Sequence, residues 1–293
     1  MYKHVAENRR NTVLIMMGFV VLIGAISAGF AWWFGDWSIL IYALIITILY
    51  VGIQYFAAGK LALTMTGAKK IEKKDNPRLY NAVENLVIQT GIPMPGVYVI
   101  NDPAPNAFAT GRDPAHASVA ATTGLLDIMD DDELIAVMAH EISHVRNYDI
   151  RITTIVFGLV SLIGLLSDIG ARMIFFGGRS DSDRGGSPVG VIIALVTAII
   201  APLAAALAQM AISRQREYLA DSSAALLTRY PEGMVNALKK LDAHKRPMRQ
   251  QNPATEAMFI TSPLRKNMIS QLFSTHPPIE KRIARLENGK KSF

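Results

Sequence analysis

The chain of 293 residues contains no cysteine. This absence excludes disulfide bonds and thiolate ligands, so a metal site in this protein would need histidine, aspartate or glutamate. It is also compatible with a cytoplasmic location. A second absence concerns nucleic acid. Although the formal net charge is +6, no basic stripe with interleaved aromatic residues occurs, and nucleic acid is therefore not expected as a partner.

Charge is missing altogether from three long apolar runs. Residues 12–34, 37–58 and 189–212 contain no Asp, Glu, Lys or Arg. Each run is longer than the roughly 20 residues that a helix needs to cross the hydrocarbon core of a membrane. The first run is too long for the apolar part of a signal peptide and leads almost directly into the second. We therefore expect a transmembrane helix from each run, the first being a retained anchor.

A fourth run, residues 152–176, is weaker. It is uncharged as far as Ser167 and then contains Asp168 and Arg172, which are four positions apart and able to pair. We expect this run to span the membrane with the pair near the far interface, because a charge at mid-membrane is costly. The alternative is a buried helix, or a shallow helix that does not span.

Basic residues indicate the orientation. Lysine and arginine are in excess in the first ten residues, after the second run and after the last run, whereas the other two connections have no such excess. Cytoplasmic segments carry such an excess. The pattern predicts a multi-pass protein of the cell (inner or plasma) membrane with both termini in the cytoplasm. Trp32, Trp33 and Trp37 flank Gly35-Asp36, which is typical of a hairpin turn at a membrane surface.

The most informative stretch is H-E-I-S-H at residues 140–144. Asp130 and Glu133 resemble a capping box, and apolar residues follow at helical spacing, so the stretch is expected on a helix. Positions four apart share one helical face, so the imidazoles of His140 and His144 can reach the same ion. Glu141 lies close enough to reach a water on that ion. The pattern is typical of a zinc hydrolase. The alternative, a chance match on a solvated helix, is disfavoured because the chain has only 6 histidines.

A catalytic zinc site needs a third protein ligand. The best candidate is Glu217, which shares one helical face with Asp221, four positions later. Glu217 could bind zinc, and Asp221 could accept a hydrogen bond from a ligand histidine and fix its tautomer. The alternative is a charged, solvated face just after a hydrophobic segment. Composition by itself favours that alternative.

Four stretches together resemble the HtpX-type family of zinc-dependent membrane metallopeptidases, which are relatives of the CAAX prenyl endopeptidases. They are N-A-F-A-T-G at 106–111, H-E-I-S-H at 140–144, R-Q-R-E-Y-L-A-D at 214–221, and S-T-H-P at 274–277 followed by Arg282-Ile283. They occur in the family's order and cover nearly the whole chain. The resemblance implies Zn²⁺ as cofactor, held by His140, His144 and Glu217, with Glu141 as catalytic base.

A small sheet is expected before the zinc helix, because residues 97–100, 107–110 and 117–123 have strand composition. A protease must hold its substrate extended, and an exposed sheet edge does so through main-chain hydrogen bonds. We predict that residues 106–111 form that edge. The substrate-binding positions would be Asn106, Ala107, Phe108 and Ala109. A plain core strand is the alternative.

The C-terminal stretch contributes one further candidate. His276 is predicted to stabilise the tetrahedral oxyanion, or to occupy the open zinc position at rest. The alternative is a structural residue that caps the following helix. The charged residues of that last helix, Arg282 among them, are interpreted as a solvated or interdomain face.

The expected fold is a mainly α membrane protein, with four transmembrane helices and a cytoplasmic zincin-like α+β catalytic domain that contains a small sheet. Residues 1–58 form an N-terminal transmembrane hairpin and residues 152–212 a second one. Residues 59–151 and 213–293 form the two cytoplasmic parts of the catalytic unit. Because the second hairpin separates His144 from Glu217, the active site is expected beside the cytoplasmic membrane surface.

These features predict an endopeptidase whose partners are membrane protein or polypeptide substrates and the lipid bilayer. The resemblance favours quality control of misfolded or damaged membrane proteins over processing of prenylated peptides. Two other classes stay open. One is a membrane-bound chaperone or scaffold with a non-catalytic zinc site, although a binding module needs no Glu141. The other is a transporter with Asp168 and Arg172 in its pathway, for which one charge pair is thin support.

Overall fold

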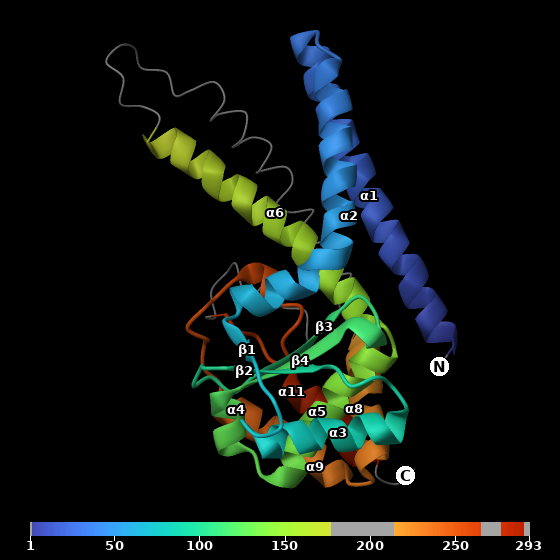
Figure 1. Cartoon of the computed structure of the whole chain (residues 1–293), viewed down its shortest axis with the longest axis vertical. Helices are drawn as coiled ribbons and strands as arrows, with labels where there is room; N and C mark the ends of the chain where they lie inside the picture. Colours follow the sequence, from blue (N-terminus) through green and yellow to red (C-terminus); the bar gives the residue numbers. More distant parts are fainter. Residues whose placement is uncertain (1, 177–213, 265–276, 290–293) are drawn as a thin grey trace.

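The structure, a computed structural model, describes residues 2–176, 214–264 and 277–289. Two long helices, α1 (Tyr2–Phe34) and α2 (Ser38–Met65), pack against each other as an antiparallel hairpin that projects from the rest of the molecule (Figure 1). Gly35 makes the turn with a φ of 69°, a left-handed conformation that glycine adopts without strain. The hairpin predicted around Gly35-Asp36 is confirmed.

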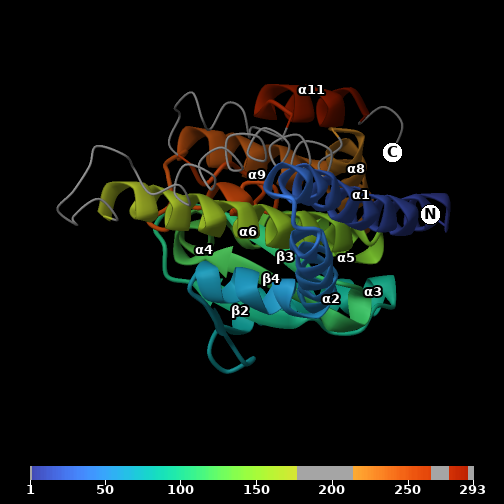
Figure 2. The same cartoon turned by 90° about the horizontal axis from the view of Figure 1, so that it is seen from above.

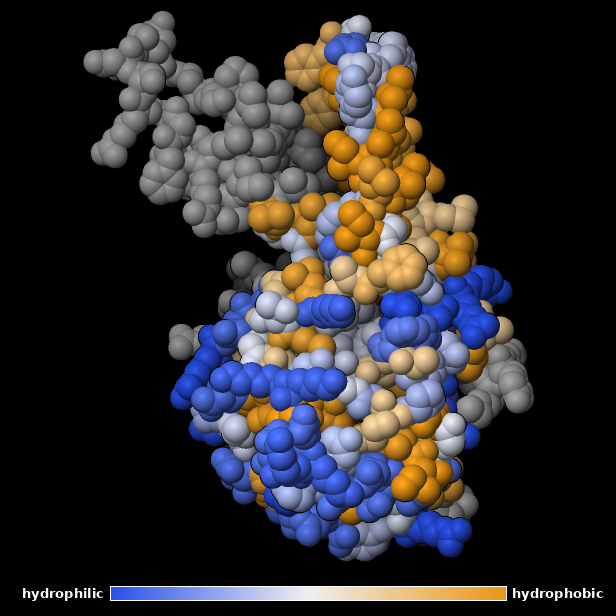
Figure 3. All heavy atoms as spheres, in the orientation of Figure 1, coloured by the Kyte–Doolittle hydropathy of each residue, from blue (hydrophilic) through white to orange (hydrophobic). Residues whose placement is uncertain are grey.

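Among the described residues, two helices are long and apolar enough to cross a membrane by themselves, Val5–Phe34 and Ser38–Met65. Apolar side chains dominate the surface of this hairpin, whereas hydrophilic side chains are frequent on the body (Figure 3). The exposed fraction of both Trp32 and Trp33 is 76%. So large an apolar surface is suited to lipid rather than to water.

The other two predicted spans are less clear. The run at residues 152–176 lies in α6 (Asp149–Phe176), whose part from Asp149 to Leu165 passes the same test only together with the preceding α5 (Asp131–Arg146). The two helices are bent by 82° at their junction, so this pair is a broken span at most. The run at residues 189–212 lies outside the described residues. Two of the four predicted spans are thus found as single continuous helices in the described part of the chain.

A four-stranded mixed sheet lies in the body of the molecule, in the order β1-β2-β4-β3. The strands are β1 (Ala68–Lys70), β2 (Gly96–Ile100), β3 (Ala107–Gly111) and β4 (Ala117–Thr122). β2 and β4 are parallel, and the two outer strands are antiparallel to their neighbours. The three predicted strands are confirmed to within a residue or so. β1 was not predicted, because three residues with two lysines carry no strand pattern.

The two faces of the sheet pack against different helices, since successive strand residues point to opposite sides. The paired Val97 and Val119 face a core built with α3 (Pro77–Thr90) and α5. The paired Phe108 and Ala120 face a second core, built with α2, α6 and Phe259. α5 is therefore held directly below the sheet, and β3 lies between α5 and α6 (Figure 1).

The C-terminal helices complete the body around α5. α8 (Arg214–Thr228) and α9 (Pro231–Ala243) pack against α5, and α11 (Ile279–Gly289) lies on α8 and α9 (Figure 2). The short helices η1 (Pro114–His116), α4 (Thr123–Ile128) and η2 (Pro253–Thr255) fill the connections. Segments that precede and follow residues 152–212 thus share one core, with α5 at its centre.

Candidate metal centre

The start of α5 is fixed by a complete capping box. The Asp130 carboxylate accepts a hydrogen bond from Glu133 N at 2.9 Å, and the Glu133 carboxylate accepts one from Asp130 N at 2.8 Å. Lys240 of α9 donates to the same buried Glu133 carboxylate at 2.5 Å and offsets its burial. The cap sets where the helix begins, and so determines which face carries His140 and His144. That face looks towards α8.

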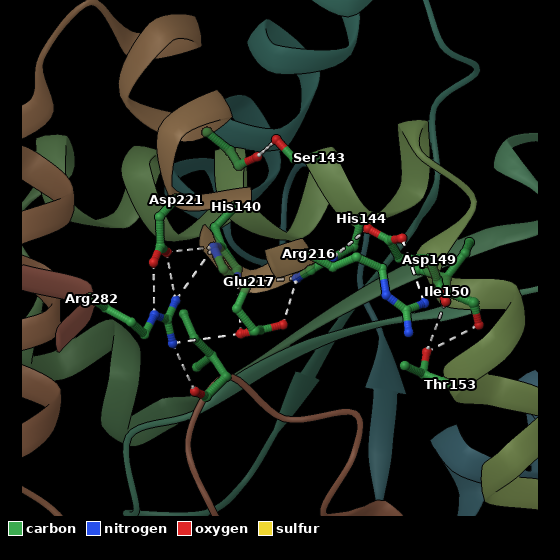
Figure 4. A network of polar contacts seen from close by, with 12 residues as sticks. His140, Ser143, His144, Asp149, Ile150, Thr153, Arg216, Glu217, Asp221 and Arg282 are labelled. Atoms are coloured by element: carbon green, nitrogen blue, oxygen red, sulfur yellow. Dashed lines mark hydrogen bonds and ion pairs between the residues drawn. The ribbon is translucent and has the colours of Figure 1, made fainter. Parts of the chain in front are cut away.

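Three side chains from α5 and α8 converge on one point (Figure 4). His144 Nε2 lies 3.2 Å from His140 Nε2 and 3.4 Å from Glu217 Oε1. His140 Nε2 lies 3.8 Å from Glu217 Oε2. Ligand atoms about 2.0–2.2 Å from a tetrahedral zinc ion are about 3.3–3.6 Å from one another. The three distances bracket this range, so the group can hold a divalent ion after small side-chain adjustments.

Each imidazole has its other nitrogen on a buried carboxylate. His140 Nδ1 lies 3.0 Å from Asp221 Oδ1, and His144 Nδ1 lies 3.0 Å from Asp149 Oδ2. An ionised carboxylate only accepts hydrogen bonds, so Nδ1 of the neutral ring carries the proton and Nε2 presents a lone pair. Two lone pairs and a carboxylate then face one another. This is the arrangement that a divalent cation needs, and so the donor set fits a metal ion.

Burial and charge separate the pKa values of the two histidines. Burial lowers the pKa of His140 below its ordinary value, although the Asp221 carboxylate opposes this. Burial also disfavours the charged form of His144, but hydrogen bonds to Asp149 and Glu217 prevail and hold its pKa well above the ordinary value. His140 is therefore ready to ligate, whereas a metal ion must displace a proton from His144.

Asp149 was missed by sequence reasoning, which had proposed Asp221 alone as a carboxylate partner for a ligand. Asp149 follows His144 by five positions and would not share its face on a continuous helix. The chain instead turns between α5 and α6 at Tyr148, whose φ is 62°. This turn brings the first residue of α6 back to the imidazole. An acidic residue shortly after H-E-x-x-H was the only signal available in the sequence.

Arg282 requires a correction. The sequence placed it on a solvated or interdomain face, but its exposed fraction is 1%. Its Nε and Nη2 donate to the two carboxylate oxygens of Asp221 at 2.8 and 2.6 Å. Its Nη1 lies 3.7 Å from Glu217 Oε2. Ile279, Arg282 and Leu286 are the buried residues of α11, and this i, i+3, i+7 spacing was the signal that could have shown it.

Arg282 also lowers the pKa of Asp221. Burial by itself would raise the pKa of Asp221, but the guanidinium beside it holds that pKa below its ordinary value. Asp221 is therefore ionised and accepts hydrogen bonds from both Arg282 and His140 (Figure 4). Removal of the cation would leave a buried carboxylate without its compensating charge, which is strongly destabilising.

A small pocket with about 30 Å³ of free volume lies beside the three ligands. It is lined by Glu141, by Ala109 of β3 and by residues 257–260. A volume of this size holds one or two water molecules and is too small for the side chain of a peptide. Glu141 thus lines the same pocket as the three converging side chains, where it can reach a water molecule.

The strand predicted to hold substrate forms β3 at the edge of the sheet, but it is not exposed. All five of its residues are buried. Ile260 N donates to Ala107 O at 3.0 Å, and Phe108 forms an antiparallel bridge with Phe259. The sequence could not indicate this, because the covering segment comes from a distant part of the chain. The prediction of an exposed edge is therefore wrong, because residues 259–261 cover part of this edge.

Asn106 holds the covering segment in place. Its Nδ2 donates to Thr261 O at 2.8 Å, and its Oδ1 accepts from Thr261 N at 3.2 Å. The carboxamide therefore contacts the protein's own main chain in the way that the prediction assigned to a substrate. His276, the remaining predicted site residue, lies outside the described residues.

The chain is similar to known proteins over most of its length. Residues 73–290 match peptidase family M48. The chain is 49% identical over 293 residues to a "Protease HtpX homolog" of Tropheryma whipplei (strain Twist), with 100% of both chains covered. It is 44% identical over 294 residues to a "Protease HtpX homolog" of Ligilactobacillus salivarius (strain UCC118), covering 98% of this chain and 99% of the relative. Among solved structures, it is similar to S. mikatae Ste24p, with a TM-score of 0.48, 20% identity and coverage of 93% of this chain and 61% of the other.

Proposed function

The chain belongs to peptidase family M48, and from this premise we propose that it is a zinc-dependent endopeptidase of the cell membrane. It would hydrolyse peptide bonds at the cytoplasmic membrane face. The observation that carries the proposal is the convergence of His140, His144 and Glu217 beside Glu141 in one pocket. A binding module or scaffold would not need Glu141.

The residues divide the chemistry between them. A bound zinc ion supplies a Lewis acid that lowers the pKa of water and polarises the substrate carbonyl. Glu141 takes the proton from the attacking water and returns it to the leaving amine. Asp221 and Asp149 hold the Nδ1 protons of the two histidines, so that both Nε2 atoms keep facing the ion.

Misfolded or damaged membrane proteins are the substrates that we propose. Two apolar helices project from the body that carries the ligand group, which supports action beside a bilayer. His144 lies near the end of α5, shortly before α6 leaves the body on the side of the hairpin (Figure 1). The excess of lysine and arginine in the connecting segments supports placement at the cytoplasmic membrane face.

The proposal is tested by metal removal. The full chain, purified in detergent, should cleave casein and a misfolded membrane protein. A zinc chelator should abolish both activities, and added Zn²⁺ should restore them. A prenylated peptide serves as the competing substrate and should be cleaved more slowly than the membrane protein. Zinc-loaded protein that cleaves none of the three substrates, or cleavage that persists after complete removal of metal, would show that the proposal is wrong.

The substrate is further proposed to pair with the main chain of Ala109. Thr122 N donates to Asn106 O at 2.9 Å, so alternate residues from Asn106 onwards bond to β4 and those between them face outwards. On this outer side, Ile260 binds Ala107 O, and Thr154 Oγ1 accepts from Gly111 N at 3.0 Å. Ala109 lies between these two contacts and lines the pocket.

Ala109→Pro is therefore expected to lower kcat/KM by about tenfold, the worth of one hydrogen bond to the substrate. Proline removes an N–H that faces away from β4, so the sheet ladder is kept. Zinc affinity should not change. Ala109→Ser keeps the N–H and is the matched control. Equal kcat/KM values for the proline and serine variants would contradict pairing at this position.

A further inference from the structure

The amino-terminal end of α1 is fastened to the corner between α5 and α6. Asn8 is buried, with an exposed fraction of 5%. Its Nδ2 donates to Asn147 O at 2.9 Å and to Asp149 Oδ1 at 2.6 Å. These contacts join residues 139 and 141 positions apart in the sequence. The first helix of the hairpin is thus attached at its base to the segment that follows the metal helix.

The corner itself needs such an attachment. Tyr148 adopts a φ of 62°, a conformation that is strained for a residue with a large side chain. The guanidinium of Arg9 lies 4.9 Å from the centroid of the Tyr148 ring, and that of Arg151 lies 5.1 Å from it. Both are cation–π contacts that favour this placement of the ring. Asn8 and Arg9, neighbours on α1, therefore contact successive parts of one turn.

The two carboxylate oxygens of Asp149 contact different residues. Oδ1 accepts from Asn8, and Oδ2 lies 3.0 Å from His144 Nδ1. Arg216 Nη1 also lies 3.9 Å from Oδ1, within ion-pair range. Asn8 gives the shorter contact to this oxygen, so it contributes to the orientation of the carboxylate and, through it, of the imidazole.

We propose that Asn8 is a positioning residue of the metal centre, acting through Asp149 on His144. The helix that anchors the protein would then also hold one of its zinc ligands in the binding orientation. This proposal rests on the proposed metal centre and adds a residue that lies in none of the four sequence motifs. It predicts that substitutions at the amino-terminal end of α1 alter metal binding although every metal ligand is retained.

The test compares zinc affinities, measured by competition with a chelator on the full chain in detergent. Asn8→Leu keeps the branching at Cγ and the number of side-chain heavy atoms but removes the donor, and should weaken zinc binding by about tenfold or more. Asn8→Gln retains a carboxamide donor and should recover part of the affinity. If Asn8 only filled space, the order would be reversed, because leucine shares the branched shape of asparagine whereas glutamine is one atom longer. The visible spectrum of Co²⁺-substituted protein should change in the leucine variant and be restored by glutamine.

Asn11→Leu is the matched control. Asn11 lies one turn further along α1 and lines the same cavity as Asn8, so it should leave zinc affinity and the cobalt spectrum unchanged. Asn8→Ala gives the same comparison if Asn8→Leu fails to fold. Wild-type affinity and spectrum in the variants without a donor would overturn the role of Asn8 alone. An unsubstituted chain that binds no zinc would instead overturn the metal centre on which the role depends.

Discussion

Glu141→Gln is expected to keep its zinc and to lose proteolysis. Glutamine has the size of glutamate but cannot take a proton from water at neutral pH. The loss of a general acid–base residue lowers kcat by about 10²–10⁴-fold. Glu141 is not one of the three converging ligands, so the metal should remain. The measurement is zinc content per chain together with kcat on a casein substrate.

Glu217→Gln is the matched control, because it makes the same chemical change at a ligand position. A neutral carboxamide is a poor ligand for zinc, so this variant should lose metal and activity together. Its zinc affinity should fall by more than the 10–100-fold that is typical of residues that merely support a ligand. An active Glu141→Gln variant would remove that residue from the mechanism. Unchanged zinc content in Glu217→Gln would mean that the third ligand lies elsewhere.

Arg282→Met is expected to cause the largest loss of stability. Methionine occupies much of the volume of the buried arginine but leaves the Asp221 carboxylate without its cation. Breaking a buried ion pair on one side costs about 3–5 kcal/mol. Because Asp221 also orients His140, zinc affinity should fall as well. The thermal unfolding midpoint in detergent, measured with and without zinc, tests both effects.

Arg285→Met, three positions later on the same helix, is the control. Arg285 lies on the exposed side of α11, and its guanidinium is 4.6 Å from the centroid of the Tyr218 ring. Such a contact is worth only about 0.5–1 kcal/mol. The double variant Asp221→Leu with Arg282→Met should regain part of the stability, since apolar groups often replace a buried ion pair at little cost. It should not regain zinc affinity. Equal destabilisation by the two single arginine variants would contradict this account.

The parts of the fold that were predictable from the sequence are those with local causes. α3 starts where Asn76 caps Leu79 N and ends where Gly91 adopts a φ of 69°. α5 starts at the capping box of Asp130. These signals lie within a few residues of the boundary that they set. The spacing of His140, Glu141 and His144 is local in the same sense, so the metal helix could be recognised directly.

The parts that were not predictable depend on contacts between distant segments. Asp149 reaches His144 only because the chain bends by 82° between α5 and α6, at Tyr148. The burial of Arg282 depends on Asp221, which lies on a different helix. The cover over β3 depends on Thr261 binding Asn106. No local pattern encodes these pairings, although the buried spacing of α11 contained a hint for Arg282.

The convergence of three side chains on one divalent ion is the claim on which the rest depends. Diffraction from crystals of the zinc-loaded protein, recorded at the zinc absorption edge, tests it most directly. The account predicts one anomalous peak within about 2.0–2.2 Å of His140 Nε2, of His144 Nε2 and of a Glu217 carboxylate oxygen. Absence of a peak at this position, or a zinc ion bound by the two imidazoles with Glu217 out of range, would contradict it.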